Sequence, residues 1–205
     1  MYDKYILPHV LNYSCGQKPF IKQREKIVPM AKGDVLEVGI GSGLNMPFLD
    51  SNKINTFKGI DPSEKLISMA EQKISDSMPK VDFMVSAAEE MEFNDESFDT
   101  VLMTYTMCTI GDLSSAMKQI KRVLKPQGQL LFCEHGLAPE EKVIVWQNRT
   151  NRFWSYISGG CNLNKNIPVL LQEADFKIVS MDTMYLPKTP KILGYNYWGN
   201  AIKKS

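Results

Sequence analysis

The sequence has little that would point to a metal site, a secreted protein or a membrane protein. Its 205 residues include two histidines and four cysteines, and no two cysteines form a Cys-x-x-Cys pair. This spacing argues against zinc and favours a reducing compartment. No apolar run approaches the roughly 20 residues that span a bilayer. The first residues, MYDKYILPHV, do not resemble a signal peptide. We therefore expect a cytoplasmic protein without a metal.

An excess of one charge is also lacking. The chain has 24 Lys+Arg and 23 Asp+Glu, a net charge of +1, so no overall field attracts nucleic acid or an anionic membrane. With 43% hydrophobic and 23% charged residues, the composition excludes a disordered chain and a disulfide scaffold. The length is that of one domain.

Predicted strands and helices alternate along the chain. Short apolar stretches predict strands at 34–38, 56–60, 81–85, 98–105, 129–134, 176–185 and 195–202. Apolar residues at helical spacing predict helices at 18–30, from about 44, at 63–75, from 112 to Pro126, at 139–158 and at 166–174. Ser63 and Asp112 are expected to cap two of these helices. The alternation implies a mostly parallel sheet covered on both faces, an α/β fold. The link 186–194 is too short for a crossover, so the last strand should run antiparallel.

The clearest motif is VLEVGIGSG at residues 35–43, where a strand ends in a turn with three glycines. Glycine there permits unusual backbone angles and lets a ligand approach the main chain. Asp61 ends the second strand 22 residues after Gly39. That is the spacing at which a carboxylate meets the ribose hydroxyls of an adenosine ligand.

Two residues distinguish between adenosine ligands. The dinucleotide fingerprint G-x-G-x-x-G/A fails at Leu44, which disfavours a nicotinamide dehydrogenase. Glu37 precedes the turn, where its charge would repel a pyrophosphate but suits a ligand with an ammonium and a sulfonium. We therefore expect S-adenosyl-L-methionine (SAM), with S-adenosyl-L-homocysteine as product.

Four segments resemble the class I SAM-dependent methyltransferases of the ubiquinone/menaquinone-methyltransferase type (methyltransferase type 11). They are VLEVGIGSG at 35–43, GIDPS at 59–63, AEEMEFNDESFD at 88–99 and RVLKPQGQLLF at 122–132. The resemblance implies the Rossmann-like, seven-stranded sheet of that class. It also implies a single domain over 1–205, with a helical cap at 1–33, a cofactor-binding half at 34–135 and a substrate-side half at 136–205.

The resemblance carries over to single positions on the cofactor side. Gly39, Gly41 and Gly43 match the loop under the methionine part of SAM, and Glu37 matches the acid that holds this loop and the amino group. Asp61 matches the ribose-binding residue.

Further positions match the surroundings of the adenine and of the methyl group. Pro62 would lie beside the adenine, and Ala88 and Glu89 match the stretch whose backbone lines it. The preceding residue is often an aspartate in the family, and here it is alanine, which removes one hydrogen bond to the adenine. Thr104 and Tyr105 match the place beside the transferable methyl group.

His135 is the second candidate for catalysis, with Tyr105. It should leave the fifth strand at its carboxyl end, toward the cleft where ligands bind in open α/β sheets. A neutral imidazole there can accept the proton of a thiol or phenol, or orient the nucleophile. No N/D/S-P-P-Y/F motif follows the fourth strand, which argues against amide or nucleobase acceptors and hence against a nucleic-acid substrate.

The second half resembles the methyltransferase-like thiol methyltransferases through Glu134-His135, a Trp-rich helix and Gly160-Cys161-Asn162-Leu163. Those proteins carry an N-terminal hydrophobic anchor that this chain lacks, so a soluble or peripheral enzyme is implied. The expected reaction is in-line methyl transfer to a small apolar acceptor, with a thiol favoured.

Other interpretations stay open at this point. A phospholipid amine or a quinone could be the acceptor at a membrane surface, with peripheral contact through the aromatic segment 139–157. A non-catalytic SAM-binding module is the alternative of another class. The aromatic residues of 139–157 are expected to be buried or to form a lid, and Cys108, Cys133 and Cys161 to be small buried hydrophobes. The oligomeric state is not predicted.

Overall fold

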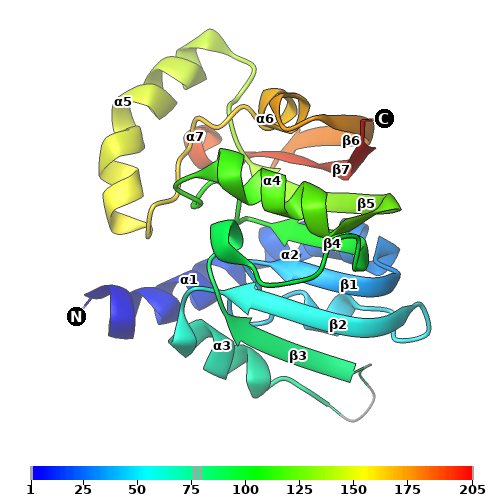
Figure 1. Ribbon diagram of the computed structural model, residues 1–205. Coiled ribbons are helices and arrows are strands. Elements are labelled where there is room, and N and C mark those ends of the chain that lie inside the picture. The colour runs from blue at the N-terminus through cyan, green and yellow to red at the C-terminus, as the bar shows by residue number, and fades with distance from the viewer. Residues whose placement is uncertain (1, 76–77, 79, 205) are drawn as a thin grey trace.

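The sheet has seven strands. The computed structural model describes residues 2–75, 78 and 80–204, so both ends of the predicted 1–205 range lie outside the described residues. In the order β3-β2-β1-β4-β5-β7-β6 the strands form one twisted sheet (Figure 1). Their bounds are β1 Gly33–Val38, β2 Ile54–Asp61, β3 Lys80–Val85, β4 Phe98–Thr104, β5 Leu124–His135, β6 Phe176–Tyr185 and β7 Tyr195–Lys203. Strands β1 to β5 pair in parallel, and β7 runs antiparallel to both β5 and β6. This confirms the predicted fold class.

Helices cover both faces of the sheet. They are α1 Leu7–Cys15, α2 Lys18–Ile27, α3 Glu64–Glu71, α4 Leu113–Val123, α5 Glu141–Ile157, α6 Ile167–Glu173 and α7 Lys191–Gly194, with short helical turns at Tyr2–Ile6, Val28–Met30, Met46–Phe48 and Ala88–Glu90. Successive strand residues point to opposite faces. Val35 therefore packs with residues of α2 and α3, and Leu36 packs with residues of α4 and α6. The predicted caps are present, since Ser63 Oγ accepts from the Leu66 N–H and Asp112 Oδ1 from the Ser115 N–H.

The prediction of a helix from about residue 44 is wrong. The chain forms turns after β1 and then only the three-residue turn Met46–Phe48. Gly43 has φ +73°, a left-handed angle that does not lead into a right-handed helix. Pro47 has no N–H to donate. The N-terminal region also differs from expectation, because α1 and a preceding turn come before the predicted helix, which itself ends at Ile27 and continues as a tighter turn.

The expected burial of the aromatic residues of helix α5 is wrong for three of them, whereas Trp154 is half-buried. Trp146, Phe153 and Tyr156 are 55%, 70% and 85% exposed. The buried residue of this helix is Gln147, whose side-chain amide binds backbone groups of the loops after β5 and α5 and of helix α7. Figure 1 shows α5 standing beside the sheet rather than flat on it. Among the described residues no helix is both long enough and apolar enough to span a bilayer.

Candidate active site

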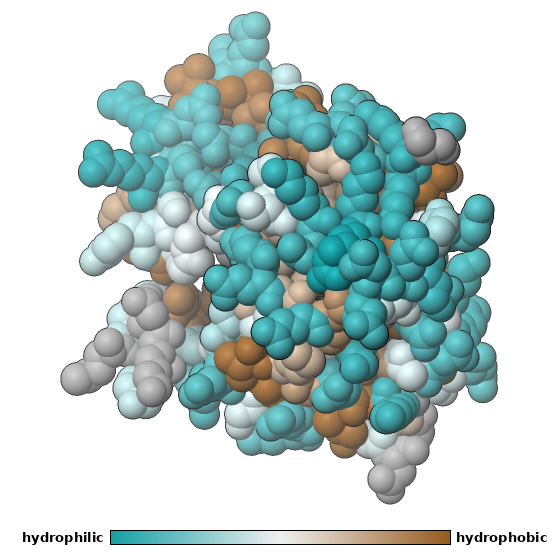
Figure 2. Space-filling model, in the orientation of Figure 1, coloured by the Kyte–Doolittle hydropathy of each residue, from teal (hydrophilic) through white to brown (hydrophobic). Residues whose placement is uncertain are grey.

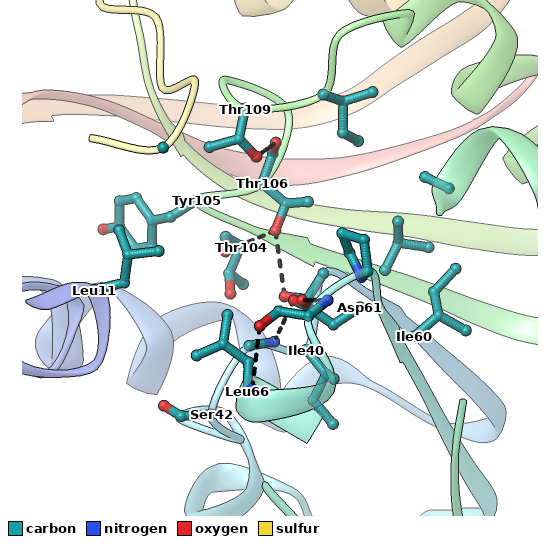
Figure 3. A pocket seen from close by; sticks show the side chains of 18 of the residues that line it. Leu11, Ile40, Ser42, Ile60, Asp61, Leu66, Thr104, Tyr105, Thr106 and Thr109 are labelled. Carbon is teal, nitrogen blue, oxygen red and sulfur yellow. Dashed lines mark hydrogen bonds between the residues drawn. The ribbon is translucent and has the colours of Figure 1, made fainter. Parts of the chain in front are cut away.

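A cavity of about 520 Å³ lies at the carboxyl ends of the central strands, within the size range of small-molecule sites. Its walls come from the loop after β1, the ends of β2 and β4, and helix α1. In Figure 3, Asp61 and Ile60 lie on one side of it and Leu11 and Tyr105 on the other. Parallel strands end at one edge of the sheet, which is why residues far apart in sequence meet here.

The glycine loop forms the floor of the cavity. Gly39 and Gly41 have φ +73° and +56°, angles that are cheap only for glycine. A Cβ at Gly39 would collide with the side chain of Thr106, whereas a Cβ at Gly41 would meet nothing within 4 Å. The first glycine is therefore required by packing, and the second leaves the main chain open to a ligand.

Asp61 joins this loop to the start of α3. Its Oδ2 accepts from the Gly41 N–H at 3.0 Å and its Oδ1 from the Ser63 N–H at 2.9 Å. Burial raises the pKa of this carboxyl, and the two backbone hydrogen bonds oppose that rise. The carboxylate is thus held at the edge of the cavity by the main chain, positioned to accept from hydroxyl groups of a ligand.

Glu37 is buried beneath the loop and is only 1% exposed. Its Oε1 accepts from Asn45 Nδ2 at 2.7 Å, and its Oε2 has no partner in the described part of the chain. Burial raises the pKa of Glu37 to about 8, against the opposing charge of Arg24. A cation that reaches the free Oε2 would stabilise the ionised form of this carboxyl.

Arg24 of α2 brings a buried positive charge to the same place. Its Nη1 donates to Asn45 Oδ1 at 2.7 Å and also to Thr104 Oγ1. Its guanidinium carbon lies 5.1 Å from the centroid of the Tyr105 ring. The Nε atom of Arg24 has no partner among the described residues. Arg24 and Glu37 thus meet at Asn45, and each keeps one buried polar atom without a partner in the described part of the chain.

Tyr105 follows β4 in a left-handed conformation, φ +57°, which is rare for a residue other than glycine and clusters at functional sites. Glu134 holds this turn, because its Oε1 accepts from the backbone N–H groups of Thr106 and Met107 at 2.8 and 3.1 Å. Burial raises the pKa of Tyr105 well above its usual range. Its hydroxyl stays protonated and donates to Asn196 Oδ1 at 2.7 Å, so the phenol is not placed to act as a base.

His135 ends β5 but does not face the cavity as expected. It is buried, and its Nε2 lies 2.9 Å from Cys161 Sγ, which in turn lies 3.4 Å from Cys108 Sγ. Cys108 and Cys133 are buried as expected, whereas Cys161 is half-buried and polar in its contacts. The Cys108 hydrogen bond and the His135 charge lower the pKa of Cys161. Burial lowers the pKa of His135, but the charge and hydrogen bond of Cys161 and the charge of Glu134 together raise it above its ordinary value.

The structure brings most of the predicted site residues to one cavity. Those that line it are Gly39, Gly41, Asp61, Pro62, Ala88, Glu89, Thr104 and Tyr105. Three others, Glu37, Gly43 and His135, lie behind its walls. Gly43 packs against Met46 and Ala70, where a side chain would not fit, and so supports the loop from beneath.

Similarity to known proteins decides the family. The family described as "Methyltransferase domain" matches residues 36–132. The human thiol S-methyltransferase TMT1B is 30% identical over 214 residues, covering 98% of this chain and 86% of the human protein. The chain belongs to the class I SAM-dependent methyltransferases.

Two further similarities extend this assignment. The yeast protein "Methyltransferase OMS1, mitochondrial" is 27% identical over 186 residues, covering 82% of this chain but 39% of the yeast protein. The chain therefore spans well under half of that relative. A SAM-dependent methyltransferase from Methanosarcina mazei superposes with a TM-score of 0.68 at 22% identity, covering 83% of this chain and 92% of that one. The structural match confirms the fold.

SAM is the methyl donor of this class, and the unpaired polar atoms of the site fit it. Its amino group is a cation that complements the free Oε2 of Glu37, and its carboxylate complements Arg24. Asp61 is the acceptor suited to the ribose hydroxyls. Arg24 is not among the predicted site residues, although it shares the apolar face of its helix with Phe20 and Ile27, which is an unusual place for a cation.

Proposed function

We propose that this methyltransferase transfers the methyl group of SAM to a small apolar thiol. The observation that carries the proposal is the position of the Cys108–His135–Cys161 group next to the apolar end of the cavity. Leu7 and Leu11 of α1 and Tyr105 line that end, and Figure 3 shows Leu11 beside the Tyr105 ring. The similarity to a thiol S-methyltransferase supports the same acceptor.

Different residues hold the donor and the acceptor at the two ends of the cavity. Glu37 and Arg24 hold the amino-acid end of the donor, and Asp61 holds its ribose. SAM supplies a sulfonium methyl group that an acceptor sulfur attacks in line. The protein contributes mainly by holding donor and acceptor in reach and in alignment. Tyr105 and Thr104 form the wall beside the reacting atoms, and His135 acts on the acceptor side.

A membrane-surface acceptor is the second candidate function, because an exposed apolar face favours it. Val145, Trp146 and Phe153 of α5 are more than half exposed. Figure 2 shows apolar residues gathered at the upper left, over α5. A phospholipid amine or a quinone would be reached by peripheral contact of this helix. With the thiol acceptor we propose a cytoplasmic, single-domain enzyme that does not act on nucleic acid.

Acceptor specificity is tested with a panel containing an alkyl thiol, an aryl thiol, a catechol, a demethylated quinone and phosphatidylethanolamine vesicles. The readout is S-adenosyl-L-homocysteine formed per enzyme. Turnover with thiols alone is expected. Turnover only with the lipid or quinone would replace the thiol by the membrane acceptor, and SAM binding without turnover on any compound would indicate a non-catalytic module.

The acceptor-side role of His135 is tested by His135→Ala, with Asp61→Ala as the matched cofactor-side variant. His135→Ala should lower kcat for the thiol more than it raises the Kd of SAM. Asp61→Ala should do the reverse. Equal effects of both variants on the Kd of SAM and on kcat would contradict the division of the site into two ends.

A further inference from the structure

Three side chains that commonly bind metals converge beside the cavity. Cys108 lies in the turn after β4, His135 ends β5, and Cys161 lies in the loop after α5. Their sulfur and nitrogen atoms all lie within 4.8 Å of one another. Within the ranges that the structure describes, no other three His, Cys, Asp or Glu side chains are grouped in this way.

We propose that Cys108, His135 and Cys161 bind a Zn²⁺ ion. Two thiolates and an imidazole form a donor set that zinc prefers among biological cations. With zinc–sulfur bonds of about 2.3 Å and zinc–nitrogen bonds of about 2.0 Å, tetrahedral binding places two sulfurs about 3.8 Å apart and sulfur and nitrogen about 3.5 Å apart. The observed distances are 3.4 Å between the sulfurs and 2.9 Å between His135 Nε2 and Cys161 Sγ. For these two pairs an ion needs the atoms to separate by about half an ångström, and all three ligand atoms already lie within 4.8 Å of one another.

The surroundings also favour a cation. Glu134 is completely buried, and its Oε2 has no hydrogen-bond partner among the described residues. Its charge acts on the neighbouring His135. Burying a carboxyl oxygen without a partner is costly unless a cation compensates it. A divalent ion bound to the three side chains would offset this negative charge.

The expectation that the protein has no metal was based on the spacing of cysteines along the chain. That spacing does not reveal cysteines that the fold brings together. Cys108 and Cys161 are 53 residues apart, yet their sulfurs are in contact. Such a site is invisible to a search for Cys-x-x-Cys, because two separate loops and the end of β5 supply its ligands.

Three protein ligands leave a coordination position for a non-protein ligand, as catalytic zinc sites do. The group borders the cavity, since Thr106 and Thr109 on either side of Cys108, and Gly159 near Cys161, line its wall. This part of the inference rests on the proposed function. An acceptor thiol would replace water on the zinc and release its proton to solvent. Its sulfur lone pair would then form the new carbon–sulfur bond as the sulfonium carbon–sulfur bond breaks, and the zinc would keep its oxidation state.

Metal content is the first test. The full chain, kept reduced, is incubated with Zn²⁺, freed of excess metal by gel filtration and analysed by mass spectrometry. One zinc per chain is expected. Replacement by Co²⁺ should give the thiolate-to-cobalt absorption and the intense visible bands of a tetrahedral site. No retained zinc and no such spectrum would overturn the proposal, and would leave the His135–Cys161 contact as a simple polar pair.

Matched variants locate the ion. Cys108→Ser and Cys161→Ser should lose zinc and the cobalt spectrum, whereas Cys133→Ala, which removes a buried cysteine outside the group, should keep both. Zinc retained by all three would contradict the site. If a variant fails to fold, the cobalt spectrum of the unmodified protein still decides, because sulfur ligation is visible there.

Activity measurements distinguish the metal proposal from the proposal of a thiol acceptor. Removal of zinc with a chelator should abolish thiol methylation while SAM still binds, and added zinc should restore it. Thiol turnover that is unchanged in verified metal-free protein would refute the acceptor role of the metal and leave the proposed function intact. Bound zinc with no thiol turnover would confirm the metal site and refute the thiol acceptor.

Discussion

Replacement of Glu37 by Gln should stabilise the ligand-free protein at alkaline pH. The buried carboxyl has a pKa of about 8 instead of an ordinary value near 4.5. Between these values the native state keeps a proton that the unfolded chain has released, so stability falls as pH rises. The gap corresponds to about 5 kcal/mol, fully lost above pH 8. The groups that face Glu37 are Arg24, which opposes the shift, and Asp61, which adds to it.

The measurement is urea unfolding of the wild type and of Glu37→Gln without SAM at several pH values from 5 to 9. The difference in the free energy of unfolding should grow in favour of the variant as pH rises, by several kcal/mol in total. Glu71→Gln, on an exposed position of α3, is the matched control and should show no such trend. Parallel curves for wild type and Glu37→Gln would refute the assignment of a buried, protonated acid.

The same substitution should weaken SAM binding, because the amide cannot pair with the ligand's ammonium. A lost charged hydrogen bond of about 1.5–3 kcal/mol raises the Kd about 10- to 100-fold. Near neutral pH the wild type should also release protons when SAM binds, which the variant cannot do. Calorimetry in two buffers of different ionisation heat measures this release. Unchanged affinity and unchanged proton release together would show that Glu37 does not meet the ligand's ammonium.

Four further substitutions test the site, two on the cofactor side and two in the glycine loop. Asp61→Ala should raise the Kd of SAM about 10- to 100-fold in a titration, and an unchanged Kd would remove Asp61 from the site. Arg24→Met should raise the Kd of SAM to a similar extent. The control ligand is 5′-methylthioadenosine, which lacks the carboxylate. An equal loss of affinity for this compound would contradict the pairing of Arg24 with the carboxylate of SAM. Gly39→Ala should lower the free energy of unfolding by about 1–3 kcal/mol or more. Gly41 has a left-handed angle like Gly39, but a Cβ there would meet no neighbour. Equal losses in the free energy of unfolding for Gly39→Ala and Gly41→Ala would show that the collision with Thr106 does not matter.

The local sequence pattern was sufficient to predict the strands of the sheet and the ligand-binding loop. Apolar stretches between glycine and proline predicted the seven strands, because the period of two and the turn residues act over a few positions. The prediction of a SAM site at Glu37, the glycines and Asp61 has the same local basis, since these residues sit at the ends of two adjacent parallel strands. Residues 39–43 have the backbone angles that these neighbouring residues require.

Tertiary structure alone decided the contacts that join distant segments. Arg24 binds Thr104 across 80 residues, and only the packing of α2 on the sheet makes that contact. His135 turns toward Cys161 instead of the cavity, because the loop after α5 passes over the end of β5. Side-chain direction at a strand end depends on what packs there, and sequence patterns do not contain that information. The helix expected after the glycine loop failed likewise, because Asn45 is held by Glu37 and Thr104 and the chain must turn to place it there.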